Sequence, residues 1–335
     1  MIFSRRHVLP VKKLLRDVFK DSVMSKFINQ TYISLKTTSD EYNDYNNIKK
    51  KYNVRGLPTV IFFDRNGNEI DRNCGYDGEK DKYFQTIQDY AANKNTLQKL
   101  IDNYKADSLN VENNFKLAMK YLNRWEMEKG DQYFRNVLQL DPENHYGFKE
   151  QSSLNIAIMK YQKGQNISSL QSFMKSNPES KFLWILYGYL LDHYQNIKDT
   201  TNFLKTSERA IEQFPEKDVA YWRLLNYYNT RDDTSKILKT FQIVVTNLPE
   251  DPGYLNWYAW TIYEYRLKHL YNKAIKMARR AVDLESESDE IWDTLGWLYY
   301  ESGDTDKAIK AMETAAKLSP EIKSYQENLD KFKSQ

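Results

Sequence analysis

The chain has 335 residues, of which 41% are apolar and 28% are charged, so it is expected to fold rather than remain disordered. Its 49 basic and 46 acidic residues are interleaved and give a formal net charge of +3. That balance offers no broad basic face for a phosphate backbone, so a nucleic acid is not an expected partner. No run of about 18 apolar residues occurs, so no membrane span is expected either.

The first ten residues bear on localisation. Arg5, Arg6 and His7 stand where a secretory signal peptide would need an apolar run. As written, the chain therefore carries no export signal, and the cytoplasm is the default expectation. A true start farther upstream would hide a signal peptide and would make a periplasmic location the expectation instead.

Residues 1–93 alternate between helical and strand-like patterns and predict an α/β domain. Asn66-Gly67 is a strong hairpin-turn signal, because both residues tolerate a positive φ. The expected elements are a helix over 11–28, a strand over 32–35, a short polar helix over 42–52, strands over 59–63 and 69–74, and a helix over 83–92. Residues 94–111 follow as a connecting helix, since Leu97, Leu100 and Ile101 have helical spacing.

From residue 112 the pattern is entirely helical, and it repeats. Prolines 142, 178, 215, 249 and 320, with Ser286 in the equivalent place, recur at intervals of 34 to 37 residues. A period in this range is typical of a solenoid of stacked helical hairpins. We therefore expect an all-α array of about six hairpins over 112–320, followed by a capping helix over 321–335.

The last unit of this array is the clearest. It contains Trp292, Leu295, Gly296 and Tyr299, followed by Ala308, Ala315 and Pro320. This spacing closely resembles the tetratricopeptide repeat, in which small residues let two helices approach and large ones fill the space around the crossing. The resemblance implies a hairpin array that packs through these seven residues.

The same resemblance implies a binding surface. In that family the first helix of each hairpin lines a groove with positions just beside the packing ones, which suits a protein or peptide partner. Carried onto this sequence, the implied groove residues are Trp222, Asn226, Asn229, Tyr258, Tyr265, Asp293, Trp297 and Tyr300. The lysine-rich clamp that some family members use for a terminal carboxylate is not seen, so a ligand of that kind is not implied.

The block from Lys51 to Gly78, with Gly-Leu-Pro-Thr before an apolar run, resembles the second half of a thioredoxin-like domain. The resemblance implies a cis peptide bond before Pro58. It also aligns Val8 and Val11 with the two redox cysteines of bacterial thioredoxin-like proteins. Valine supplies no thiolate for disulfide exchange, so the resemblance implies the fold without the chemistry.

The expected function follows from these absences. Of the four histidines, none is paired at ligand spacing, and no cofactor motif occurs, so neither a metal site nor a cofactor is expected. We expect a non-catalytic interaction or scaffold protein, in which the array binds a partner and the redox-inactive domain docks or caps it. The alternative is a thiol-disulfide oxidoreductase or isomerase acting through Cys74, the single cysteine, or together with a partner.

Overall fold

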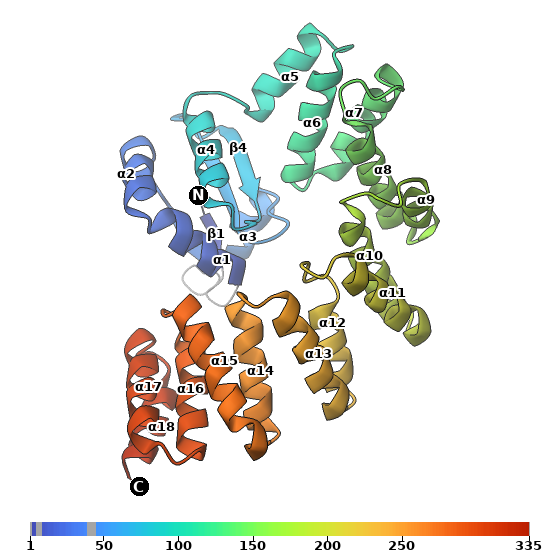
Figure 1. Ribbon diagram of the computed structural model, residues 1–335. Helices are drawn as coiled ribbons and strands as arrows, with labels where there is room; N and C mark the ends of the chain where they lie inside the picture. The colour runs from blue at the N-terminus through green and yellow to red at the C-terminus, as the bar shows by residue number, and fades with distance from the viewer. Residues whose placement is uncertain (1, 5–8, 39–44, 335) are drawn as a thin grey trace. The chain divides into compact units, whose positions relative to one another are not determined.

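The computed structural model describes residues 2–4, 9–38 and 45–334. The chain divides into two compact units, residues 1–178 and 179–335, which are described separately (Figure 1). Within the described ranges, no helix is both long and apolar enough to cross a membrane.

A four-stranded sheet organises the first part of the first unit as far as it is described. Its order is β2-β1-β3-β4, with β1 at Ile2–Ser4, β2 at Lys36–Thr38, β3 at Thr59–Phe63 and β4 at Glu69–Cys74. β1 runs parallel to β2 and antiparallel to β3, and β3 and β4 form an antiparallel hairpin. The predicted strands over 59–63 and 69–74 are confirmed, and Gly67 in the turn between them has a φ of 81°.

The expected continuous helix over 11–28 is wrong. The segment contains α1 (Leu9–Leu14), the π-helical η1 (Leu15–Phe19) and α2 (Ser22–Thr31). Asp21 separates them in an extended conformation, and its carboxylate accepts hydrogen bonds from the backbone N–H groups of Val23 and Met24. An aspartate that caps a helix start in this way is more stable there than inside a helix. Sequence periodicity did not register this interruption, because the apolar spacing continues across it.

The strand expected over 32–35 lies later, at β2, because Tyr32 ends α2 and Ile33 is fully exposed. The short helix expected over 42–52 is α3 (Tyr45–Lys51), and residues 42–44 lie outside the described residues. The helix expected over 83–92 is α4 (Lys80–Ala91). Val60, Phe62, Ile87 and Tyr90 pack in the core between the sheet and α4.

Five further helices complete the first unit. They are α5 (Leu97–Ala106), α6 (Val111–Asn123), α7 (Met127–Leu140), α8 (Lys149–Gly164) and α9 (Ser168–Ser176). α6 packs against α7, and α8 packs against α9, so the helices after α5 form hairpins. A Cβ added at Gly130 would lie 3.1 Å from the carbonyl oxygen of Ala118, which explains the small residue at the first crossing.

The second unit is all-helical. Its helices are α10 (Leu183–Asn196), α11 (Thr200–Gln213), α12 (Tyr221–Asn229), α13 (Thr234–Asn247), α14 (Pro252–Glu264), α15 (Tyr271–Leu284), α16 (Asp289–Glu301), α17 (Thr305–Leu318) and α18 (Lys323–Lys333), with the 3-10 turn η2 (Lys268–Leu270) before α15. Successive helices from α10 to α17 pack as pairs, and α18 packs on α17. The observed fold is therefore an α/β domain joined to an array of helical hairpins.

Two repeated contacts set the register of this unit. At the α16–α17 crossing, a Cβ added at Gly296 would lie 3.5 Å from the carbonyl oxygen of Ala308. Between hairpins, Tyr254 donates its hydroxyl to Asp218, and Tyr325 donates in the same way to Asp289 across 3.0 Å. Both pairs span 36 residues, so α18 occupies the place that the first helix of another hairpin would take.

Candidate functional site

The redox positions of the first domain contain no reactive group among the described residues. Val8 lies outside those residues, whereas the side chain of Val11 is buried, with 2% exposure. The peptide bond between Leu57 and Pro58 is cis, as the resemblance implied. The Val11 side chain supplies no thiolate, so it cannot itself take part in disulfide exchange.

Cys74 ends β4 opposite Thr59, the residue after Pro58. The thiol is partly buried, and the Thr59 hydroxyl lies 3.9 Å from its sulfur. Burial raises the pKa of the Cys74 thiol above its ordinary value, and neighbouring charges do not reverse that shift. The thiol is therefore held protonated at neutral pH, which is the unreactive form.

The loop around Pro58 is covered by the turn between α6 and α7. The ring of Trp125 lies against Gly56 so closely that an added Cβ would overlap Cζ3 and lie 2.8 Å from Cη2, and it also approaches Gly75. Arg55 Nη1 donates to the carbonyl oxygen of Trp125 across 2.6 Å. Trp125 has a positive φ of 57°, which is rare for a large residue. The first hairpin thus covers the surface where β3 begins and β4 ends.

A cluster of charges joins β4 to α6 beside this contact. Asp71, in the middle of β4, has no exposed side-chain surface; its carboxylate accepts from Lys120 Nζ and from the backbone N–H of Leu97, and it pairs with Arg124. Arg124 also contacts Glu69 at 2.8 Å and Glu126 at 3.2 Å. Each buried charge therefore has an opposite partner, which is the condition for tolerating such groups in an interior.

The titration of this cluster reflects both burial and pairing. Burial alone would raise the pKa of Glu69, but the hydrogen bond from Arg72 and the charges of Arg72 and Arg124 lower it below the ordinary value. The pKa of Glu126 is lowered in the same way, by Lys129 and Arg124 against burial. Burial lowers the pKa of Lys120 despite the nearby Asp71. We call this cluster of paired charges, Glu69, Asp71, Lys120, Arg124 and Glu126, the ionic junction.

In the second unit, repeat register defines a set of equivalent positions on the first helices. The starts of α13 (Thr234) and α17 (Thr305) are 71 residues apart, so residues of α12 are equivalent to residues of α16 that lie 71 positions later. The N-caps of α14 and α16, Asp251 and Ser288, are 37 residues apart, so residues of α14 are equivalent to residues of α16 that lie 37 positions later. We call the resulting set the repeat face: Trp222, Asn226 and Asn229 on α12; Asn256, Trp260 and Tyr263 on α14; Asp293, Trp297 and Tyr300 on α16.

Tyr258 does not belong to this face, which corrects the sequence expectation. Its side chain is 1% exposed and its ring stacks on Phe241 with centroids 4.9 Å apart. The reason is an insertion: six residues separate α14 from α15, whereas three separate α16 from α17. Tyr258 lies 35 residues before Asp293, two fewer than the 37 that separate the N-caps, so Asn256 and not Tyr258 holds the register of Asp293. Tyr265 caps the end of α14, and its hydroxyl lies 3.5 Å from Asn229 Oδ1.

Asn256 and Tyr263 hold the register that the sequence analysis had given to Tyr258 and Tyr265, and Trp260 holds that of Trp297. Their rings lie 4.9 Å apart, and Tyr263 in turn lies 5.7 Å from Trp297. The signal that could have found them is the spacing of 37 residues between the helix starts Asp251-Pro252 and Ser288-Asp289, which also separates Pro249 from Ser286.

The repeat face differs along its length. On α12, Trp222 is 40% exposed, and Asn226 and Asn229 are exposed. On α16, the residues are partly covered by α18: Phe332 stacks on Tyr300 at 4.3 Å, and Lys331 Nζ lies 4.7 Å from the Trp297 ring centre. Burial raises the pKa of Asp293 to about 6. The α12 part is therefore the open part of the face.

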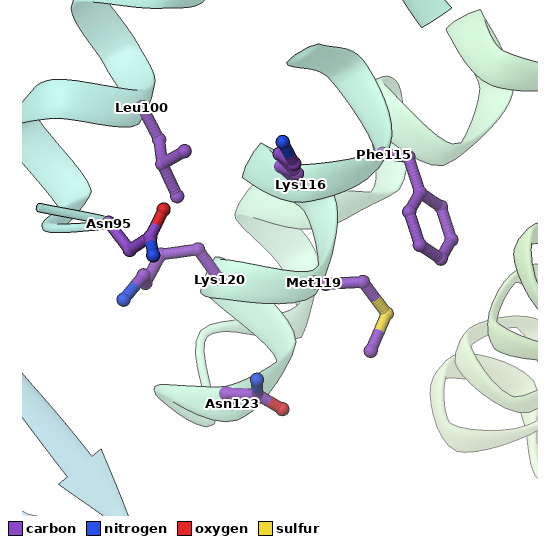
Figure 2. Close-up of a pocket in the computed structure, with 7 residues that line it drawn as sticks. All are labelled: Asn95, Leu100, Phe115, Lys116, Met119, Lys120 and Asn123. Atoms are coloured by element: carbon purple, nitrogen blue, oxygen red, sulfur yellow. The ribbon is translucent and has the colours of Figure 1, made fainter. Parts of the chain in front are cut away.

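The first unit has a pocket that the sequence analysis missed. It lies on α6 beside the start of α5 and is lined by Asn95, Leu100, Phe115, Lys116, Met119, Lys120 and Asn123 (Figure 2). α7 begins 178 residues before α17, so Phe115 and Met119 hold the same register as Asp293 and Trp297. The usable signal was this register, but Asn114 and Ala118 stand where the last hairpin has its tryptophan and glycine, and only the leucine is kept, as Leu117. Among the described residues, no cluster of His, Cys, Asp and Glu could hold a metal ion.

Comparison with known proteins agrees with this architecture. Residues 1–91 match the family model of a thioredoxin-like domain, and residues 289–322 match that of the tetratricopeptide repeat. No curated protein sequence matches the chain.

Several solved structures of helical repeat proteins are similar to the chain. A thermophilic TPR protein of Thermus thermophilus is 17% identical over 56% of this chain and all of its own, with a TM-score of 0.32. A tetratricopeptide repeat protein of Parabacteroides merdae is 13% identical over 60% of this chain and 72% of its own, with a TM-score of 0.39. The Cut9-Hcn1 complex of the APC/C is 12% identical over 70% of this chain and 46% of its own, with a TM-score of 0.39. The chain combines a thioredoxin-like domain with an array of tetratricopeptide-type helical hairpins.

Proposed function

We propose that this protein is a non-catalytic interaction protein whose helical array binds a peptide or a folded surface of another protein. The thioredoxin-like domain docks on the first hairpin and caps the array at that end. Its own chemistry is absent, since Val11 is a buried hydrocarbon and Cys74 is held protonated by burial.

The observation that carries the proposal is the contrast between two sets of side chains on α12. Tyr221, Leu224 and Leu225 are buried in packing, whereas Trp222, Asn226 and Asn229 lie exposed beside them. An exposed tryptophan next to exposed amides offers contact area together with donors and acceptors for a peptide backbone. The Arg223 guanidinium lies 4.5 Å from the Trp222 ring centre and pairs with Asp192, which holds both groups in place.

The aromatic residues of α14 and α16 extend the same face. Trp260, Tyr263 and Trp297 form a chain of ring contacts, so this part of the surface is rigid rather than adaptable. Rigid aromatic side chains lose little conformational entropy when a partner binds, which favours them as anchors. We place the main contact on α12 and a supporting contact on α14.

Affinity purification with mass spectrometry tests the proposal, with Trp222→Ala as the probe. The matched control is Ile243→Ala, since Ile243 is 38% exposed but lies on α13, a second helix, away from the repeat face. We expect proteins captured by the wild type to be lost with Trp222→Ala and kept with Ile243→Ala. Equal recovery with both variants would contradict the proposed face.

A further inference from the structure

The pocket on α6 combines an apolar wall with positive charge. It encloses about 310 Å³. Figure 2 shows Asn95, Leu100 and Lys120 on one side of it and Phe115 and Met119 on the other. Two of its seven lining residues are lysines and none is a carboxylate. A volume near 300 Å³ is at the low end for a ligand site, and it suits a pair of side chains better than a whole cofactor.

The apolar wall of the pocket is formed by Phe115 and Met119. The Phe115 ring stacks on Phe148 with the planes 3° apart and the centroids separated by 4.1 Å, which fixes its orientation. Met119 lies beside it, and only one side of its side chain packs on the core around Phe134 and Ile156. A methionine next to a fixed ring adapts its shape to an incoming aliphatic or aromatic group.

The charged wall of the pocket is formed by Lys116 and Lys120, and the ammonium group of Lys120 has an N–H donor left for an anion. Lys120 Nζ contacts Asp71 at 2.8 Å and the Tyr90 hydroxyl at 3.1 Å, which accounts for two of its three N–H donors. Asp71 does not depend on this lysine alone, because it also pairs with Arg124 and accepts from the backbone of Leu97. An entering carboxylate therefore meets a partly desolvated ammonium without leaving Asp71 unpaired.

Lys116 adds a second, more mobile ammonium. It pairs with Glu112 one turn earlier at 2.8 Å, but both side chains are about half exposed, at 51% and 52%. Exposed pairs of this kind are weak, so Lys116 exchanges Glu112 for a carboxylate in the pocket at little cost. Asp89, another acidic group whose charge acts on Lys120, is already engaged by Gln85 and Asn95.

We propose that this pocket binds an acidic segment of a partner protein, with an aspartate or glutamate side chain at Lys116 and Lys120 and a neighbouring apolar residue against Phe115 and Met119. The inference rests on the proposed function, because it names a second contact for the partner of the array. The side chain amides of Asn95 and Asn123 stand at the rim, where they can bond the peptide backbone.

A peptide selection tests the pocket with defined probes. Random dodecapeptides displayed on phage through their C-terminal ends are selected on the full-length chain. The enriched sequences are then made with an amidated C-terminus, so that only side-chain carboxylates are probed. Affinity is measured by fluorescence anisotropy for the wild type, Lys116→Glu, Met119→Ala, Trp222→Ala and the control Lys105→Glu, which reverses an exposed charge on α5 outside the pocket lining.

We expect a class of enriched peptides with an acidic residue next to an apolar one. Their affinity should fall about tenfold with Lys116→Glu and several-fold with Met119→Ala, and it should change little with Lys105→Glu. Peptides that lose affinity only with Trp222→Ala would overturn the pocket and leave the proposed function standing. Peptides insensitive to all variants, or no enrichment at all, would also overturn the pocket, whereas the proposed function fails only if the affinity purification shows equal recovery with Trp222→Ala and Ile243→Ala.

Discussion

The guanidinium of Arg124 pairs with the carboxylate of Asp71 across 53 residues of sequence, and the Asp71 side chain has no exposed surface. Asp71 belongs to the thioredoxin-like sheet, whereas Arg124 directly follows the first helix of the first hairpin. The pair therefore joins the thioredoxin-like domain to the first helical hairpin inside one compact unit. The same carboxylate also accepts hydrogen bonds from Lys120 and from the backbone N–H groups of Leu97 and Arg72, so this buried group is well paired.

Removal of Arg124 should be costly for this reason. Arg124→Ala leaves Asp71 and Glu69 short of their shared partner in a buried place, and loss of one member of such a pair destabilises by about 3–5 kcal/mol. Urea unfolding followed by circular dichroism measures the loss of stability. The control is Arg135→Ala, which breaks an exposed pair with Asp131 and should cost about 0.5 kcal/mol or less. Similar losses of unfolding free energy in both variants would mean that the buried ion pairs of Arg124 do not stabilise the fold more than an exposed pair does.

The lowered pKa of Glu126 makes the junction sensitive to acid. A carboxyl whose pKa is lower in the folded than in the unfolded state stabilises the fold above its unfolded value, here near 4.5, and loses that contribution as the pH falls through the folded value. The difference in urea midpoint between the wild type and Glu126→Gln should therefore be constant from pH 7 to 5 and shrink below about 4.5.

Glu128→Gln is the control for the acid experiment, because Glu128 is an exposed neighbour on α7. Its midpoint should follow that of the wild type at every pH. A gap between wild type and Glu126→Gln that persists undiminished to pH 3 would show that Glu126 contributes through packing and not through its charge.

Gly56 should not tolerate a side chain. In Gly56→Ala the new Cβ would overlap Trp125 Cζ3 and lie 2.8 Å from Cη2, so the ring or the loop must move, at a cost of about 1–3 kcal/mol. Gly164→Ala, where nothing lies within 4 Å, should be neutral or stabilising. The double variant Gly56→Ala/Trp125→Ala removes the clash, so its loss of unfolding free energy should be smaller than the sum of the losses in the two single variants. Strict additivity, measured by urea unfolding, would contradict the contact.

Much of the fold could be predicted because its signals are local. The apolar run Thr59–Phe63 and the turn at Gly67 specify a hairpin without help from distant residues. The interruption at Asp21 could not be predicted in the same way, since α1, η1 and α2 share one apolar face and only the cap breaks them. The junction was also beyond prediction: Asp71 and Arg124 come together through tertiary packing that no periodicity encodes.

The repeat face was predicted in part. For α12 and α16, the spacing to the start of the following helix is the same, so Trp222 and Asp293 fall at equivalent positions. For α14, Tyr258 and Tyr265 were expected two residues out of register, and the loop that follows this helix is three residues longer than the loop after α16. The pocket on α6 was missed because its wall comes from two segments, α5 and a degenerate first hairpin, whose approach only the fold reveals.

Cys74 should be inert as a redox group. Burial raises the pKa of its thiol, so the thiolate fraction at neutral pH is below that of a free cysteine. In an insulin-reduction assay with dithiothreitol, the wild type should match Cys74→Ser, and native Cys74 should react with a disulfide reagent more slowly before urea is added than after. Turnover above the Cys74→Ser control would establish the oxidoreductase alternative.

Asp293 should give the second unit a pH dependence of the opposite sign. Burial raises its pKa from 3.8 to about 6, so between these values the folded state binds more protons than the unfolded state, and stability falls as the pH rises. Asn256 stands in the equivalent position on α14, which indicates that a neutral amide fits there. Asp293→Asn should therefore stabilise the unit at pH 7.5 by roughly 1 kcal/mol, after allowance for partial exposure, and flatten its profile between pH 4 and 7.

Tryptophan fluorescence during urea unfolding measures this effect, since six of the seven tryptophans lie in the second unit and only Trp125 lies in the first. Asp306→Asn, an exposed change on α17, serves as the control and should leave the profile unchanged. If Asp293→Asn instead lowers the midpoint at pH 7.5, the carboxylate must hold α18 in place through its charge, and the proximity of Asn328 and Lys331 to α16 would be the reason.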